Sequence, residues 1–157
     1  MKIIKEILSW VIPIIVGLVV ALLIRQYVFT FARVDGPSME PNLVNKERLI
    51  VWRHAKVKHL SVIVFDAHGE DPTATKPKTD YVKRVIGLPG DTVSSKNGNL
   101  YVNGKVVPQK FISMSERTTG TGNWNLKSLS KSWDKNTNAT KVPKGEYFVL
   151  GDHRSVS

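Results

Sequence analysis

The first 25 residues are dominated by one long apolar segment. Residues 7–24 (ILSWVIPIIVGLVVALLI) form a run of 18 positions without a charged side chain. As an α-helix, this run would be about 27 Å long, close to the thickness of the hydrocarbon core of a bilayer. The pattern predicts a transmembrane anchor over residues 1–25.

A cleavable secretory signal is the alternative interpretation of this segment. Lys2 and Lys5 form a short basic start, and the sequence Thr30-Phe31-Ala32 loosely resembles a small-x-small cleavage site. The apolar run is longer than the ~7–15 residues of an ordinary signal core, and Arg25 follows it directly, which favours a retained anchor. Because basic residues lie on both sides, counting positive charges does not decide the direction of insertion.

After residue 25, apolar residues occur in short clusters, mostly β-branched or aromatic, that turn residues separate. Such clusters are typical of β-strands. The predicted strands are residues 27–34, 48–53, 62–65, 81–86, 91–95, 100–102, 105–107 and 147–150. We therefore expect a mainly β fold, in which a β-rich domain follows a single N-terminal transmembrane helix.

Turn signals refine this prediction. Asn97-Gly98 and Asn103-Gly104 are strong hairpin signals because both residue types tolerate positive φ, so residues 91–107 should form a tight meander. Residues 68–80 are expected to be a loop. Residues 113–141, rich in Ser, Thr, Asn and Gly, are expected to be a variable polar insertion.

Composition and charge narrow the functional classes. The 157 residues suffice for one domain of ordinary size, and 23 Lys and Arg against 13 Asp and Glu give a net charge of +10. Such a charge suits nucleic acid or anionic lipid, and the apolar segment favours lipid. The absence of Cys excludes disulfides, thiol nucleophiles and thiolate metal sites.

Ser38 is the first candidate for chemistry. It lies in the sequence Val34-Asp35-Gly36-Pro37-Ser38-Met39-Glu40-Pro41, where the glycine and prolines impose a fixed, non-helical turn directly after an apolar strand. Such a turn can present a hydroxyl group. Taken alone, however, Gly-Pro-Ser is also common in ordinary loops.

Lys83 is the second candidate, within the predicted strand 81–86 (YVKRVI). Strand alternation places Tyr81, Lys83 and Val85 on one face and Arg84 on the other. Either one of these two cations therefore faces the interior, or both faces of the strand are partly solvated. The alternative is an edge strand on which both cations are solvated.

Together these segments resemble the type I signal peptidases, membrane-anchored serine proteases that remove signal peptides from exported proteins, and in particular the small Gram-positive branch. The resemblance covers nearly the whole chain. Its parts are the apolar segment and residues 36–41 (GPSMEP), 61–65 (SVIVF), 81–91 (YVKRVIGLPGD) and 151–154 (GDHR). The resemblance implies Ser38 as nucleophile, Lys83 as general base and the Ser38 backbone N–H as an oxyanion donor.

This chemistry is physically reasonable. A serine hydroxyl needs a base, and a desolvated lysine among apolar neighbours has a pKa below its usual value of about 10.4, so it can accept the proton. A second oxyanion donor is less well defined, because Gly36 stands where some relatives carry a serine.

The resemblance also implies the substrate and its binding site. An extended peptide would lie between the two strands and be cleaved after Ala-x-Ala-like sequences. Its binding residues would be Val34, Asp35, Gly36, Tyr81 and Val82. Expected partners are signal-peptide-bearing preproteins and anionic membrane lipids, with the catalytic domain on the extracytoplasmic side of the cell membrane.

Other motifs carry less weight. Ser128-Leu129-Ser130-Lys131 fits the S-x-x-K pattern of penicillin-binding enzymes but lacks its partner motifs. The four histidines, His54, His59, His68 and His153, lack metal-ligand spacing, so we expect no metal and no cofactor. The basic run from Lys46 to Lys58 contains only one aromatic residue, Trp52, and no recognition helix, so no nucleic-acid partner is expected.

The chain departs from the family pattern at its end. The family block is Gly-Asp-Asn-Arg-x-x-Ser-x-Asp-Ser-Arg, but His153 replaces the Asn and the sequence stops at Ser157, as expected of a truncated chain with an incomplete last segment. The predicted division is an anchor (1–25), a catalytic β domain (26–112), the insertion (113–141) and a return to the catalytic domain (142–157). Two alternatives remain open: a non-enzymatic, membrane-tethered basic binding protein, and a self-cleaving repressor with a serine/lysine dyad.

Overall fold

The computed structural model describes residues 2–71, 74–133 and 135–156. Residues up to 33 together with 48–56 form one unit, and residues 34–47 together with those from 57 onward form a second. Positions 1, 72–73, 134 and 157 belong to the predicted anchor, loop, insertion and last segment, and they lie outside the described residues.

The first unit begins with the predicted helix. Helix α1 extends over Lys2–Tyr27 and contains Pro13. Its segment Ile3–Tyr27 is long and apolar enough to cross a membrane, and none of its most apolar window is buried within the protein. A helix that is apolar on all sides needs an apolar environment, and the bilayer supplies one.

A β-hairpin completes the first unit. Strands β1 (Phe29–Arg33) and β2 (Arg48–Trp52) pair antiparallel. Phe29 lies opposite Trp52, and Phe31 lies opposite Ile50. These four side chains are 37%, 61%, 65% and 70% exposed, respectively. One face of the hairpin therefore carries two exposed pairs of large apolar side chains.

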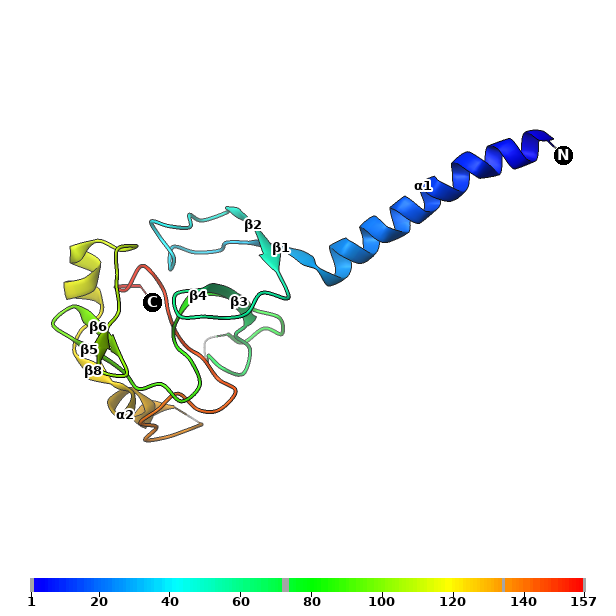
Figure 1. The fold of residues 1–157 in the computed structure, drawn as a ribbon. Helices are drawn as coiled ribbons and strands as arrows, with labels where there is room; N and C mark the ends of the chain where they lie inside the picture. The colour runs from blue at the N-terminus through cyan, green and yellow to red at the C-terminus, as the bar shows by residue number, and fades with distance from the viewer. Residues whose placement is uncertain (1, 72–73, 134, 157) are drawn as a thin grey trace. The chain divides into compact units, whose positions relative to one another are not determined.

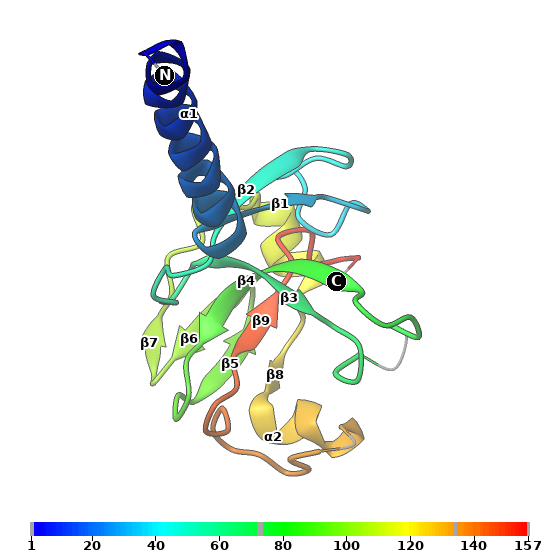
Figure 2. The same cartoon turned by 90° about the vertical axis from the view of Figure 1, so that its right-hand side faces the viewer.

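The second unit contains a three-stranded antiparallel sheet in the order β3-β4-β9. Its strands are β3 (Val62–Asp66), β4 (Asp80–Gly87) and β9 (Phe148–Leu150). The central strand β4 pairs with β3 over residues 80–84 and with β9 from Arg84 onward, with a bulge between Val85 and Gly87. Figure 2 shows β9 beside β4, so that the last residues of the chain emerge at the middle of β4.

A four-stranded sheet in the order β7-β6-β5-β8 forms the rest of the second unit. Its strands are β5 (Val93–Lys96), β6 (Asn99–Val102), β7 (Lys105–Val106) and β8 (Trp124–Asn125). The predicted meander is present, because Asn97 and Asn103 adopt positive φ angles of 51° and 52°, each followed by a glycine at 75°.

The insertion holds structure that the sequence pattern did not predict. It contains a π-helical turn η1 (Glu116–Gly120), the two-residue strand β8, a short helix α2 (Leu126–Leu129) and a 3-10 turn η2 (Ser130–Ser132) (Figure 1). Asn125 and Ser128 form a capping box at the start of α2, in which the Ser128 hydroxyl of the S-x-x-K motif accepts the Asn125 amide at 3.0 Å.

The core combines side chains of β4, of the four-stranded sheet, of α2 and of the segment after the insertion. It consists of the buried side chains Ile86, Val93, Leu100, Val102, Leu126 and Val142. Trp124 and Trp133 of the insertion pack against this core, as does Phe148. Gly87 is required by this packing, because a Cβ atom there would lie 2.6 Å from Cγ2 of Val93. The predicted fold class, an N-terminal apolar helix followed by a β-rich domain, is confirmed.

Candidate active site

The turn that carries Ser38 is held rigidly from within. The Glu40 amide donates to the Pro37 carbonyl at 3.0 Å, and the Leu43 amide donates to the Met39 carbonyl at 3.0 Å. Met39 is only 1% exposed, so its side chain anchors the turn in the protein. Gly36, directly before the turn, has a φ of 88°, a conformation that glycine adopts without strain. Ser38 itself is half-buried.

The segment after β9 forms hydrogen bonds to both ends of this turn. The backbone amide of His153 donates to the Ser38 carbonyl at 3.1 Å, and His153 Nδ1 lies 3.2 Å from the Pro37 carbonyl oxygen. At the other end, Asn42 Nδ2 donates to Asp152 Oδ2 at 2.8 Å. Two consecutive residues of the C-terminal segment therefore fix the whole turn.

Asp152 also joins this assembly to β4. Arg84 Nε donates to Asp152 Oδ1 at 2.8 Å, and Arg84 Nη2 donates to Oδ2 at 2.7 Å. The Asp152 side chain is fully buried, and the remaining Arg84 nitrogen, Nη1, donates to the Leu60 carbonyl at 2.9 Å. The guanidinium lies over the Phe111 ring, 4.2 Å from its centroid. The Ser38 turn is thus tied to the strand that carries Lys83.

Lys83 is paired with Ile63 in the β3–β4 register, and its Nζ lies 5.6 Å from the centre of the Tyr81 ring. Partial burial lowers the pKa of Lys83 below its ordinary value of 10.5, and the negative charge of Asp71 counteracts part of this effect. The effect of burial is the larger of the two, so the pKa of Lys83 is lowered and the neutral amine is favoured. Asp71 comes from the predicted loop 68–80, where its sequence position gave no sign of this role.

The five predicted substrate-binding residues lie on two segments of the second unit. Val34 is buried, and both its amide and its carbonyl are bonded, to Glu47 and Lys46. Asp35 is exposed, and the Gly36 amide donates to Asn45 Oδ1 at 3.2 Å. On β4, Tyr81 is half-buried and makes an edge contact with Phe65, while Val82 is 9% exposed and pairs with Val64.

A buried arginine, Arg154, stabilises the C-terminal segment that binds the Ser38 turn. Arg154 is 4% exposed, and its Nε donates to the Gly151 carbonyl at 2.8 Å. Its Nη1 donates to Gln109 Oε1 and to Thr121 Oγ1, each at 3.2 Å. Burial lowers the pKa of Arg154 to about 10, which leaves the side chain charged at neutral pH. Asn42 and Gln109 also hold this region together, and the sequence did not reveal either of them because neither lies in a recognisable motif.

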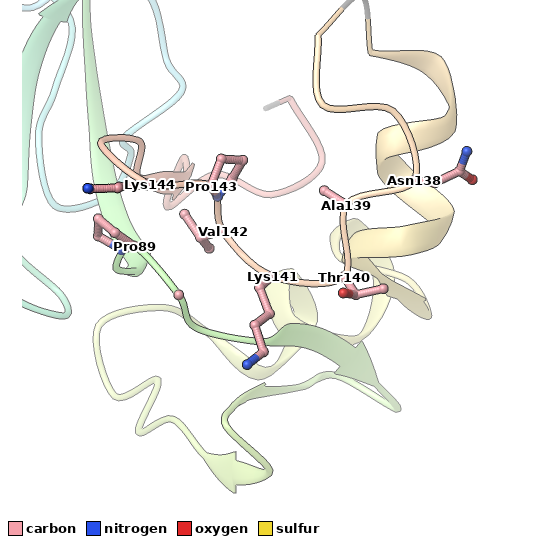
Figure 3. Close-up of a pocket in the computed structure, with 9 residues that line it drawn as sticks. Pro89, Asn138, Ala139, Thr140, Lys141, Val142, Pro143 and Lys144 are labelled. Carbon is pink, nitrogen blue, oxygen red and sulfur yellow. The ribbon is translucent and has the colours of Figure 1, made fainter.

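A groove of about 600 Å³ lies elsewhere on the second unit, lined by residues 138–144 together with Pro89 and Gly90. Figure 3 shows Pro89 facing this segment. None of the predicted site residues lines the groove. Within residues 2–71, 74–133 and 135–156, no three His, Asp or Glu side chains are grouped so that they could hold a metal ion.

Comparisons with known proteins are consistent over nearly the full length. The model of a family described as "Signal peptidase, peptidase S26" matches residues 7–157. The chain is 37% identical to signal peptidase IB of Staphylococcus aureus strain COL over 161 residues, which cover 98% of this chain and 78% of that protein. It is 39% identical to signal peptidase I S of Bacillus subtilis strain 168 over 153 residues, covering 96% and 76% of the two chains.

A solved structure shows a similar fold. The crystal structure of a signal peptidase I from Enterococcus faecalis V583 matches with a TM-score of 0.53 and 30% sequence identity, covering 66% of this chain and 82% of that one.

Proposed function

The chain belongs to the signal peptidase family, peptidase S26, and from this premise we propose that it cleaves signal peptides with Ser38 as nucleophile and Lys83 as general base. The observation that carries the proposal is the connection through Asp152. One buried carboxylate binds Arg84, the neighbour of Lys83, and Asn42, at the end of the Ser38 turn.

The proposed mechanism begins with a neutral Lys83. Its partly buried amine takes the proton of the Ser38 hydroxyl as Oγ attacks the scissile carbonyl, and the resulting ammonium returns the proton to the leaving amine. Water then hydrolyses the acyl-enzyme, with Lys83 again as base. The Ser38 amide is proposed as the donor that stabilises the oxyanion in both halves of the reaction.

The substrate is proposed to bind as an extended strand. The pairing of β9 with β4 begins only at Arg84, so β9 does not reach Val82. A peptide alongside this end of β4 would continue the sheet where β9 stops. The buried Val34 and Val82 would leave only shallow pockets, which supports selection of small side chains on the preprotein.

The first unit is proposed to hold the enzyme at an anionic membrane with its second unit on the extracytoplasmic side. β1 begins two residues after α1 ends, so the hairpin starts where the anchor leaves the bilayer. The same hairpin face that exposes Phe31 and Ile50 carries the opposed pair Arg33 and Arg48, both exposed. Large apolar side chains next to arginines are suited to the boundary between acyl chains and anionic headgroups.

Active-site labelling tests the proposed nucleophile. The full chain in detergent is treated with a β-lactam-type serine acylator and digested for mass spectrometry. Acylation of Ser38 that is lost in Lys83→Ala is expected, because the hydroxyl needs its base. Labelling spread over several exposed serines, or none at Ser38, contradicts the proposal and favours a binding protein without protease activity.

A further inference from the structure

We propose that His153 is a positioning residue that orients the peptide unit between Pro37 and Ser38. The N–H of this unit is the Ser38 amide, so the inference rests on the proposed role of that amide as oxyanion donor. The hydrogen bonds of His153 to this turn are made to backbone atoms. Its effect is exerted through the backbone.

The peptide bond between Pro37 and Ser38 is planar. The Pro37–Ser38 peptide is trans, so its C=O and N–H point in opposite directions and rotate together. The Pro37 carbonyl oxygen accepts the Glu40 amide at 3.0 Å and faces His153 Nδ1 at 3.2 Å. Because a carbonyl only accepts, the proton of this contact lies on Nδ1. Two donors fill both lone pairs of the oxygen and fix the direction of the Ser38 N–H.

A second contact from the same residue fixes the next peptide unit. The His153 backbone amide donates to the Ser38 carbonyl at 3.1 Å. His153 therefore binds the carbonyl on each side of the Ser38 α-carbon, one through its ring and one through its backbone. Donation to the Pro37 carbonyl also polarises that peptide, which makes the Ser38 N–H a stronger donor.

A residue of the insertion lies near the other ring nitrogen. His153 Nε2 lies 3.7 Å from Glu116 Oε1, on turn η1. Glu116 also accepts the Ser155 amide at 3.2 Å, and Gly120 lies so close to the C-terminal segment that a Cβ there would be 2.5 Å from the Ser155 nitrogen. In Figure 1 the yellow turn η1 lies beside the red end of the chain. Turn η1 and the C-terminal segment therefore pack closely beside the imidazole.

Three substitutions separate the two ring nitrogens. In His153→Asn the amide nitrogen can take the place of Nδ1 and still donate to Pro37. In His153→Gln the amide reaches the place of Nε2, towards Glu116, and the Pro37 contact is lost. His153→Ala loses both contacts. All three keep the backbone amide that binds Ser38, and His54→Ala in the other unit controls for the loss of a histidine.

Cleavage kinetics of the full chain in detergent, with a peptide containing an Ala-x-Ala site, give the first readout. We expect His153→Ala and His153→Gln to lower kcat about 10-fold with KM little changed, less than the roughly 100- to 1,000-fold loss caused by removing an oxyanion donor. His153→Asn and His54→Ala should keep the wild-type kcat. Equal kcat in wild type and His153→Ala, or equal values for the Asn and Gln variants, would overturn the inference.

A spectroscopic readout does not depend on turnover. Pro37-Ser38 is the only Pro-Ser dipeptide in the sequence, so labelling proline carbonyls with ¹³C and serine amides with ¹⁵N yields one correlated NMR signal. This signal should shift to lower carbonyl frequency in His153→Ala and His153→Gln, and stay near its wild-type position in His153→Asn. An unmoved signal in His153→Ala refutes the orientation itself, whereas a shifted signal in an enzyme without serine acylation refutes only the proposed function.

Discussion

The guanidinium of Arg84 donates two hydrogen bonds to the carboxylate of Asp152, at 2.8 and 2.7 Å, although the two residues are 68 positions apart in the sequence. The carboxylate is fully buried, and its Oδ2 also accepts the amide of Asn42. A buried charge is tolerated only when it is paired and hydrogen-bonded, and this one is. The pair links β4, the end of the chain and the Ser38 turn.

Replacement of Asp152 by Asn should therefore destabilise the second unit strongly. The substitution leaves the Arg84 charge largely buried without its counterion, and breaking such a pair typically costs about 3–5 kcal/mol. Urea unfolding in detergent measures the effect, and Asp80→Asn, at an exposed position, is the control. Equal stability of the two variants would show that the pair is replaceable by neutral hydrogen bonds.

Ser38→Ala and Lys83→Ala should each abolish preprotein cleavage, because the first removes the nucleophile and the second its base. Lys83→Arg should be equally inactive, since guanidinium stays protonated at working pH. Lys78→Ala removes an exposed lysine from the preceding loop and should cleave normally. Wild-type turnover by Lys83→Ala would refute the general-base role.

The pH dependence of kcat/KM should rise with a midpoint below the ordinary lysine pKa of 10.5, because burial disfavours the charged form of Lys83. Asp71 acts in the opposite direction, since its negative charge raises that pKa. Asp71→Asn should therefore move the midpoint to lower pH. A midpoint that moves to higher pH, or one that disappears when the four histidines are replaced, contradicts the assignment to Lys83.

Acid should weaken the second unit partly through Asp91. Burial alone would raise the pKa of Asp91, but hydrogen bonds from His59, the Leu88 amide and Asn103 outweigh it, so the net pKa lies below 3.8. A carboxylate whose pKa is lower in the folded than in the unfolded protein stabilises the fold at any pH above its unfolded-state pKa. This stability is lost as the pH falls through the folded-state pKa. Thermal unfolding from about pH 6 to about pH 2 should thus show a smaller acid-induced loss in Asp91→Asn. An identical loss in both proteins would exclude Asp91 as a contributor.

The apolar face of the hairpin should enter the lipid boundary. With Trp10, Trp124 and Trp133 replaced by Phe, Trp52 becomes the sole tryptophan, and brominated lipids in vesicles should quench its fluorescence. Ile50→Lys places a charge beside Phe31 on this face and should reduce the quenching. Quenching that is weak in the parent and unchanged by this substitution would show that the hairpin stays in water.

The local elements of this protein were predictable because their causes are local. An uncharged run of membrane length predicted the helix, and the β-branched clusters predicted every described strand except β8 to within a few residues. The Asn-Gly pairs predicted the hairpins, because the ability to adopt a positive φ angle depends on the residue type. The two-residue β8 was missed because only its partner β5 makes it a strand.

The candidate site could be predicted only in part. Ser38 and Lys83 stood out because they lie in long motifs that resemble a known family, and periodicity placed Lys83 on a strand. What surrounds them depends on contacts between segments far apart in the sequence. Asp71 approaches Lys83 from a loop, Asp152 binds Arg84 from the end of the chain, and His153 reaches Pro37 across 116 residues. Sequence determined which groups the protein has, but burial, charge and hydrogen-bond geometry are properties of the folded neighbourhood, and only the tertiary structure supplied them.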